Sequence, residues 1–135
     1  MRFLDTNVLI YAVSTAEEDA GKRSRALELL GTTDLALSVQ VLQEFYVQST
    51  RPSRLGALTH DEAVAFAEAM QRFPVQIITL DIMRAAFVIC DRFSLSYWDS
   101  AILAAARVLR CDAVYSEDLG AEQDYNGLRV INPFT

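Results

Sequence analysis

Four acidic residues in distant parts of the sequence could together bind a metal ion. Asp5 interrupts the apolar stretch FLDTNVLIY, and Glu44, Asp99 and Asp118 lie in or beside other apolar segments. Carboxylate oxygens are the ligands that hard cations such as Mg²⁺ and Mn²⁺ prefer, and these ions support phosphoryl chemistry. If the fold brings the four side chains together, they predict metal-assisted attack on a phosphate.

The elements that must position these acids alternate along the chain. Short apolar runs, several rich in Val and Ile, predict strands at residues 2–5, 35–38, 75–79, 113–116 and 129–132. Helical patterns fill residues 17–30, 39–50, 59–72, 81–92 and 96–110. Strands alternating with helices predict an α/β fold with a mostly parallel sheet of about five strands, covered on both faces.

This topology carries the four acids to one place. In a parallel α/β unit each strand delivers the chain to the carboxyl edge of the sheet, where ligands bind. Asp5 ends the first strand and Asp118 closely follows the fourth. Glu44 falls in the second turn of the helix after the second strand, and Asp99 lies near the start of the helix that leads into the fourth. We therefore expect four carboxylates to converge at this edge.

Each acid also has an ordinary structural explanation. Asp5 could cap a short helix that begins at Thr6, and Asp99 could interact with a helix dipole from the first turn. Asp99 shares its helical face with the apolar residues Ile102 and Leu103, however, where a surface acid would not lie. Close carboxylates repel one another unless a cation holds them, so convergence favours a metal site over four unrelated acids.

Two of the four assignments leave alternatives open. Glu44 lies on the same helical face as Val41 and Val47, which indicates partial burial with less force than for Asp99. Glu117 and Asp118 are adjacent and point in different directions, so one of them could be an ordinary surface acid. We favour Asp118 for the metal site.

Several other catalytic classes lack the residues that they need. His60 is the only histidine, which excludes a ribonuclease that uses two histidines as acid and base. Neither a G-x-S-x-G motif nor a phosphate-binding loop is present. Haloacid-dehalogenase-like phosphatases and response-regulator receivers also use acidic pockets, but both rely on a lysine late in the chain. The only lysine here is Lys22, in the first long helical segment.

Composition and charge limit the number of domains, the kind of surface and the cellular compartment that we expect. The 135 residues, 52% of them hydrophobic, suffice for one domain with a substantial core. A formal charge of −6 argues against a broad basic surface for nucleic acid, although a bound metal would itself attract phosphate. With neither a signal peptide nor a membrane span in the sequence, we expect a cytoplasmic protein. Cys90 and Cys111 are expected to be buried free thiols.

Five segments, in order and spacing, carry a family resemblance. They are FLDTNVLIY at 3–11, SVQVLQEFYV at 38–47, SYWDSAILAAA at 96–106, VYSEDLG at 114–120 and RVINPF near the end. With these segments the chain resembles PIN-domain ribonucleases of the VapC toxin type over nearly its whole length. The resemblance implies a three-layer α/β/α sandwich and a single PIN-like nuclease domain over residues 1–135.

The resemblance also implies a site, a reaction and partners. It gives Asp5, Glu44, Asp99 and Asp118 as the metal site, with Thr6, Asn7 and Ser116 in support. The implied protein is an endoribonuclease toxin, a homodimer, with a cognate antitoxin whose C-terminal segment blocks the active-site groove. We hypothesise one or two Mg²⁺ or Mn²⁺ ions that activate water for in-line attack on RNA, leaving 5′-phosphate ends. The competing hypothesis is a protein-binding module that a metal ion only stabilises.

Residues near the predicted site could contact the RNA. Arg51 and Arg54 could bind phosphates, with Arg23 and Arg25 as a second cluster, although solvated arginines explain both pairs equally well. Four aromatic residues, which could stack on an unpaired base, neighbour the site in sequence: Phe45, Tyr46, Tyr97 and Trp98. Core or dimer packing is the interpretation that we favour for them.

Overall fold

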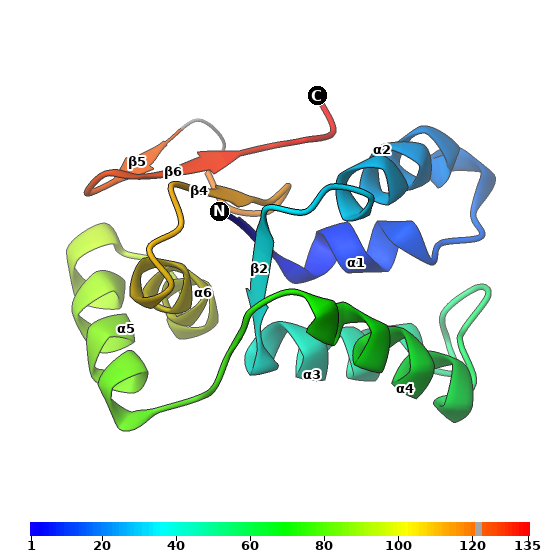
Figure 1. Ribbon diagram of the computed structural model, residues 1–135, viewed down its shortest axis with the longest axis horizontal. Helices are drawn as coiled ribbons and strands as arrows, with labels where there is room; N and C mark the ends of the chain where they lie inside the picture. Colours follow the sequence, from blue (N-terminus) through cyan, green and yellow to red (C-terminus); the bar gives the residue numbers. More distant parts are fainter. Residues whose placement is uncertain (121–122) are drawn as a thin grey trace.

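The computed structural model describes residues 1–120 and 123–135 and shows a six-stranded sheet between two groups of helices (Figure 1). The strands are β1 (Arg2–Leu4), β2 (Leu35–Ser38), β3 (Val75–Gln76), β4 (Ala113–Tyr115), β5 (Asp124–Tyr125) and β6 (Leu128–Ile131). The α-helices are α1 (Thr6–Ala12), α2 (Ala20–Leu30), α3 (Val39–Ser49), α4 (His60–Ala69), α5 (Leu80–Phe93) and α6 (Tyr97–Val108). Two 3₁₀ turns, η1 (Glu17–Asp19) and η2 (Met70–Arg72), precede α2 and follow α4.

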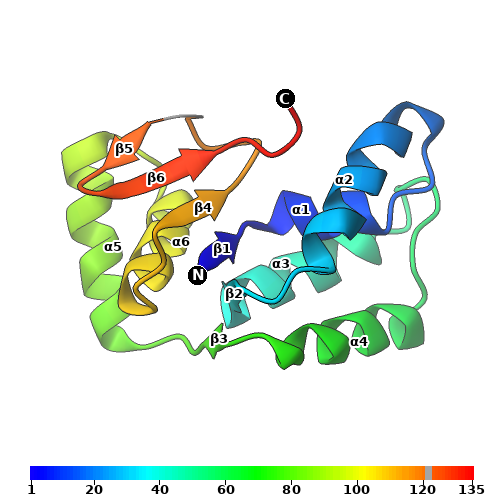
Figure 2. The same ribbon diagram turned by 45° about the horizontal axis from the view of Figure 1, so that its top comes forward.

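The sheet confirms the predicted α/β class. Its strand order is β3-β2-β1-β4-β6-β5, and every neighbouring pair is parallel except β5 with β6. Helices α5 and α6 pack side by side on one side of the strands, and α1 to α4 lie on the other (Figure 2). Because both faces are covered, the central strands are mostly apolar, and Phe3, Leu37 and Val114 are fully buried.

Side-chain caps set the starts of the helices that follow the strands. Ser38 caps α3, Thr79 caps α5 and Ser96 caps α6, each through its hydroxyl and a backbone N–H three residues later. The capping box predicted from Thr59 and Glu62 is present at the start of α4. These caps matter for function because the caps of α3 and α6 determine where Glu44 and Asp99 point.

The sheet has one strand more than the sequence predicted, and the third strand is shorter than predicted. Only Val75–Gln76 of the apolar run 75–79 pairs with β2, and Ile77 and Ile78 are 63% and 59% exposed. The run leaves the sheet because β3 is an edge strand and Thr79 already caps α5. The additional strand, β5, forms a hairpin with β6 around Asn126 and Gly127, whose positive φ angles suit a tight turn.

The two cysteines are free, but only one is buried as predicted. Cys111 is buried, whereas Cys90 on α5 is half-buried and its thiol donates to the carbonyl oxygen of Leu95 at 3.0 Å. No helix among the described residues is both long and apolar enough to cross a membrane.

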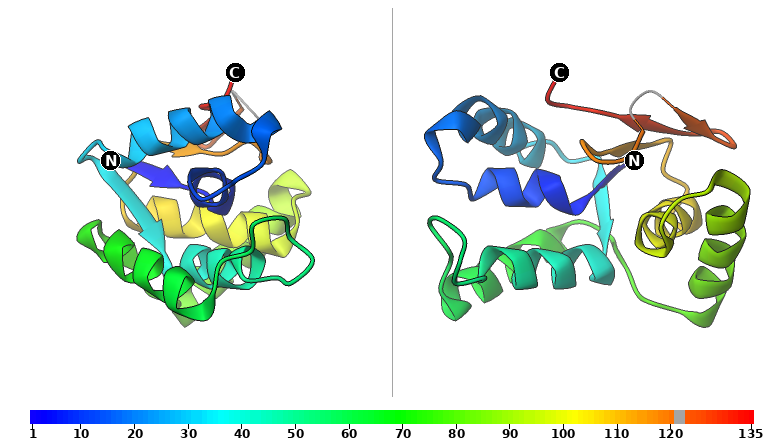
Figure 3. Two further views of the ribbon diagram at one scale, coloured as in Figure 1. Left: turned by 90° about the vertical axis from the view of Figure 1, so that its right-hand side faces the viewer. Right: turned by 180° about the vertical axis from the view of Figure 1, so that it is seen from behind.

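Helix α1 occupies the space beyond the carboxyl edge of the sheet. It leaves β1 directly, and Figure 3 shows it nearly end-on in its left panel, with α2 above it and α3 below. Helices α1 and α2 pack together, as do α1 and α3. The first residues of α1 therefore lie between the ends of the strands and the helices that follow them.

Candidate active site

Asp5 lies where β1 ends and α1 begins. Its Oδ1 atom accepts a 2.7 Å hydrogen bond from the Thr6 N–H, which caps α1, and Oδ2 accepts one of 2.7 Å from the Ser116 hydroxyl. The residue is only 6% exposed. The capping explanation considered for Asp5 is therefore correct, and it is compatible with a place in a site because the same carboxylate reaches the turn after β4.

Asn7 connects the start of α1 with that turn. Its amide nitrogen lies within hydrogen-bond distance of three acceptors: Asp5 Oδ2 at 3.4 Å, Ser116 Oγ at 3.3 Å and Asp118 Oδ2 at 3.2 Å. Its Oδ1 accepts from the Glu117 N–H at 3.2 Å. Asn7 thus holds Asp118 beside Asp5, although the two acids are far apart in the sequence.

Ser116 closes the turn after β4. Its side chain is fully buried, and its hydroxyl donates to Asp5 while accepting from the N–H groups of Asp118 (3.1 Å) and Leu119 (3.2 Å). One hydroxyl group therefore fixes both the backbone that carries Asp118 and the orientation of the Asp5 carboxylate.

Glu44 is half-buried in the second turn of α3 and faces α1. The Thr6 hydroxyl donates to Glu44 Oε1 at 2.9 Å, so this acid is also oriented by the segment after β1. Val47, predicted to share a buried face with Glu44, is instead 56% exposed, because α3 borders a surface hollow there.

Asp99 is half-buried in the first turn of α6. Its N–H donates to the Ser96 cap at 3.1 Å, and its carboxylate makes no hydrogen bond or ion pair with the part of the chain that the structure describes. Ile102 and Leu103, on the same face, are buried as predicted. Asp99 therefore lies on the inner face of α6 with its oxygens available.

All four predicted acids line one cavity of about 350 Å³. The other polar residues along its wall are Thr6, Asn7, Tyr11, Asp19, Gln48, Arg54 and Glu117. The structure thus brings together Asp5, Glu44, Asp99 and Asp118 from four separate segments, with two of the predicted supporting residues in the wall and the third, Ser116, directly behind it.

A family model decides which kind of protein this is. The model, described as the PIN domain, matches residues 2–123. The chain belongs to the PIN domain family. This confirms the family resemblance found in the sequence, while no curated protein matches this PIN domain.

Solved structures share the fold of this PIN domain. A toxin–antitoxin complex from Klebsiella pneumoniae matches with a TM-score of 0.72 and 22% identity, over 99% of this chain and 98% of that one. VapC20 of Mycobacterium tuberculosis, described as a sarcin–ricin-loop-cleaving toxin, has a TM-score of 0.69 and 22% identity, over 87% and 90% of the two chains. A DNA-bound VapBC structure from Salmonella typhimurium has a TM-score of 0.65 and 19% identity, over 96% and 95%.

The electrostatics of the PIN domain cavity centre on Asp5. Burial raises the pKa of Asp5 from 3.8 to about 6; hydrogen bonds from Ser116 and Thr6 oppose this shift, and the charges of Glu44 and Asp118 add to it. An ionised Asp5 is therefore poorly stabilised by the chain's own groups. A bound cation would supply the missing positive charge.

The donor set of the cavity fits a hard divalent cation. All the acids that line it offer oxygen, and no cysteine or histidine is among the lining residues. Within residues 1–120 and 123–135, no three Asp, Glu, His or Cys side chains stand as a complete set of direct ligands. The fit to a hard cation therefore rests on the oxygen donors that line the cavity.

Sequence reasoning missed a cluster beside the acids. The Lys22 ammonium donates to Glu117 Oε2 at 2.6 Å and to the Tyr11 hydroxyl at 3.2 Å, and Tyr11 donates to Glu117 Oε1 at 2.5 Å. The pKa of Lys22 is raised, first by its hydrogen bond to Glu117 and next by the one to Tyr11. Burial acts to raise the pKa of Glu117, but the bonds from Lys22 and Tyr11 outweigh it and lower that pKa. Glu117 is thus already in an ion pair, whereas Asp118 accepts a hydrogen bond from the neutral amide of Asn7.

The predicted arginine pairs differ in their positions. Arg54 lines the acidic cavity and donates to the Ile10 carbonyl at 3.4 Å, while Arg51 lines the hollow next to it. Arg23 and Arg25 donate instead to carbonyl oxygens of the chain, at 3.5 and 3.1 Å, and line neither space.

The aromatic residues near the acids also separate into classes. Phe45 is fully buried and stacks on Phe66 with ring centroids 4.7 Å apart, so its role is core packing as we interpreted it. The Tyr46 hydroxyl pairs with His60 at 2.9 Å on the surface. Trp98 differs from both, because it is 63% exposed and borders the acidic cavity.

Proposed function

We propose that this PIN domain, residues 1–135, is a single-domain endoribonuclease that depends on Mg²⁺ or Mn²⁺ and acts as the toxin of a type II toxin–antitoxin pair. The observation that carries the proposal is the convergence of four carboxylates, from four segments, on one cavity. The similar structures support it, since one is described as a sarcin–ricin-loop-cleaving toxin and another as a toxin–antitoxin complex.

In this proposal Asp5, Glu44, Asp99 and Asp118 hold the ion. When bound, the ion would act as a Lewis acid toward the scissile phosphate and lower the pKa of water beside it. Ser116 and Asn7 orient the Asp5 carboxylate before any ligand arrives, and Thr6 does the same for Glu44. Such supporting hydrogen bonds typically decide how well an acidic site binds its metal.

Besides the acids, Arg54 and Arg51 would contact phosphates of the RNA substrate. The Arg54 guanidinium is tethered by one hydrogen bond to the Ile10 carbonyl, which leaves other N–H groups for a phosphate oxygen in the cavity. Arg51 follows the end of α3 and lines the hollow next to the acidic cavity, where it would contact the adjoining phosphate. The two arginines would compensate locally for the negative charge of the whole chain.

The proposed partners follow from the same assignment. We propose a homodimer in the cytoplasm and a cognate antitoxin whose C-terminal segment covers the acidic cavity. The Klebsiella structure supports the antitoxin, because it is described as a toxin–antitoxin complex.

Cleavage of a mixed pool of structured RNAs by purified protein tests the function. We expect cutting with Mg²⁺ or Mn²⁺, no cutting in EDTA, and a loss of about a hundredfold or more in Asp5→Asn, because the electrostatic stabilisation at the site is removed. Hydrolysis by water predicts 5′-phosphate and 3′-hydroxyl ends. Cyclic-phosphate ends would contradict the mechanism, and metal-dependent stability without cleavage would favour a binding module.

A further inference from the structure

A second hollow of about 320 Å³ lies beside the acidic cavity, between α3 and the start of α6. The two spaces share Glu44, Gln48 and Trp98 in their walls, so they form one continuous surface. A chain of nucleotides with one phosphate at the acids would pass directly into this hollow.

One wall of the hollow carries the exposed indole ring of Trp98. Trp98 is 63% exposed, yet its ring meets the edge of Tyr97 at 5.0 Å with an interplanar angle of 82°. Its backbone carbonyl accepts a 3.1 Å hydrogen bond from Gln40 on α3, which ties the start of α6 to the opposite wall. A large aromatic surface that is both exposed and positioned is typical of a binding site.

The remaining side chains of the hollow match a nucleotide. Arg51 is exposed, and within the described chain its guanidinium has no partner. Gln43 and Gln48 add exposed amides whose hydrogen-bonding groups have no partner in the described chain either. A flat π surface, amides for a base edge and a cation for a phosphate form the combination that binds single-stranded nucleic acid.

We infer that this hollow is a subsite for one unpaired nucleobase of the substrate, with Trp98 as its stacking surface and Arg51 as the contact for the adjoining phosphate. The inference rests on the proposed nuclease function and names the residues that would contact the RNA strand next to the scissile bond. A paired base offers no free face to Trp98, so a continuous duplex would not enter.

Fluorescence tests the subsite directly, because Trp98 is the only tryptophan in the chain. The probe is a short single-stranded RNA, titrated into Asp5→Asn in Mg²⁺ and, as a second measurement, into the wild-type protein in EDTA. We expect quenching of Trp98 by this RNA, and binding about tenfold weaker for an RNA with one abasic position or for a blunt duplex.

Matched variants separate stacking from charge. We expect Trp98→Ala to weaken binding of the intact RNA about tenfold, measured by anisotropy of a labelled strand, while Trp98→Phe keeps most of it. Arg51→Gln should weaken binding with a smaller salt dependence, whereas Arg84→Gln on the exposed face of α5 should change nothing.

The outcomes distinguish the subsite from the nuclease. Quenching by RNA in a protein that cuts no RNA supports the subsite and contradicts the proposed function. Metal-dependent cutting without quenching, at the same rate in Trp98→Ala, overturns the subsite and leaves the nuclease standing. A Trp98→Ala variant that changes the oligomeric state but not RNA binding also overturns it, and assigns the indole to a protein contact.

Discussion

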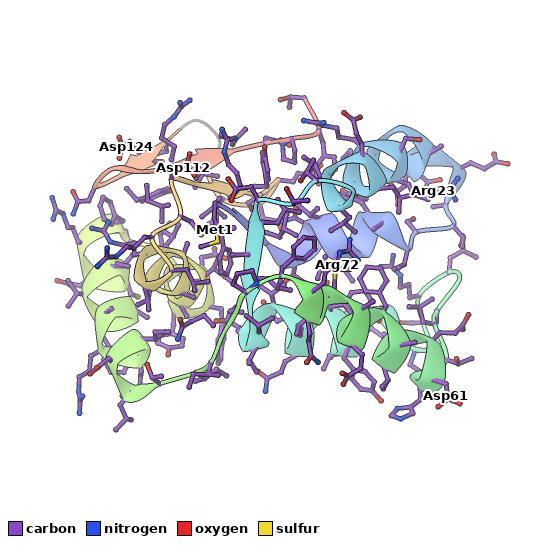
Figure 4. The ribbon with its side chains drawn as sticks, in the orientation of Figure 1. Met1, Arg23, Asp61, Arg72, Asp112 and Asp124 are labelled. Atoms are coloured by element: carbon purple, nitrogen blue, oxygen red, sulfur yellow. The ribbon has the colours of Figure 1, made fainter. Side chains whose placement is uncertain are left out.

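The two edges of the sheet treat acidic residues in opposite ways. At the amino edge, Asp34 and Asp112 lie 3.5 and 3.6 Å from the Met1 amino group, and Asp112 also lies 3.7 Å from Arg2 (Figure 4). At the carboxyl edge, six acids line one cavity, the four predicted ones among them, and Arg54 is the one cation among the described residues that line it. The chain neutralises its own acids at one edge and leaves them under-neutralised at the other.

Shifts in pKa express the same contrast. At the amino edge the pKa of the Met1 amine is raised: burial acts to lower it, and the Asp34 and Asp112 carboxylates outweigh burial. The pKa of Asp5 at the carboxyl edge is raised as well, mainly by burial. For an amine the shift means a stabilised charge, but for a carboxylate it means a destabilised one. The comparison indicates that ion pairs stabilise the acids at the amino edge, whereas burial of the Asp5 carboxylate lowers stability at the carboxyl edge.

The largest expected effect is a change in the free energy of unfolding when Asp5 at the carboxyl edge is replaced. Because the pKa of Asp5 rises from 3.8 to about 6 on folding, the folded protein binds this proton more tightly than the unfolded chain does. Protonated Asp5 therefore stabilises the folded state fully below about pH 4, and this contribution is lost as the pH rises through about 6. In EDTA at pH 7 we therefore expect Asp5→Asn to raise the free energy of unfolding by about 3 kcal/mol. Urea denaturation across this pH range measures it.

Asp112→Asn is the matched control at the other edge. It should cause a small loss of stability that high salt removes, because Asp112 is exposed and solvent screens its ion pairs with Met1 and Arg2. It should leave RNA cleavage unchanged, because it lies at the opposite edge of the sheet from the acidic cavity. The comparison fails if Asp5→Asn is less stable than the wild-type protein at pH 7 in EDTA, or if Asp112→Asn loses cleavage.

A second substitution tests whether the carboxyl edge is held ready by its supporting residues. Ser116→Ala removes the hydroxyl that orients Asp5 and the turn carrying Asp118, so we expect cleavage to fall by about 10- to 100-fold. Ser49→Ala is the control, since Ser49 is equally buried but makes only a 3.5 Å bond within α3. Equal losses in the two variants would show that any buried serine matters equally.

The smallest expected effect concerns Lys22, the cation that pairs with Glu117 beside the cavity. Lys22→Met leaves Glu117 unpaired and makes the surroundings of the cavity more negative, so the Mg²⁺ concentration for half-maximal cleavage should fall about two- to fivefold. Adding Glu117→Gln should restore the original value. Arg84→Met, which breaks an exposed ion pair on α5, should not change it, and a similar shift there would rule out a local cause.

The convergence of the four acids was predictable from the sequence, because parallel strands end at a common edge of the sheet. Asp5, Glu44, Asp99 and Asp118 each lie just after a strand or at the start of a helix, and the carboxyl ends of parallel strands share an edge. The capping signals were local as well, which is why the Thr59 box was found correctly. Site roles for these acids remain predictions that cleavage assays must test.

The remainder depended on contacts between distant parts of the chain. Lys22 meets Glu117 across 95 positions of sequence, and nothing in either local pattern indicates the pairing. The short β3 could not be inferred either, because an apolar run such as 75–79 does not reveal that its second half lies outside the sheet. The β5 hairpin did carry a signal, the Asn126–Gly127 pair, which was overlooked in favour of hydrophobic runs.

The central position of β1 determines when the acidic cavity can form during translation. This strand is synthesised before the other strands of the sheet, but it lies between β2 and β4, and its ladder with residues 113–115 joins distant parts of the sequence. Ser116 and Asp118, which complete the wall around Asp5, follow directly after that late strand. Contacts so distant in sequence form only once both partners exist. A ribosome that has not yet translated residues 113–118 therefore carries no finished cavity, and any activity of this domain begins only after that segment is made.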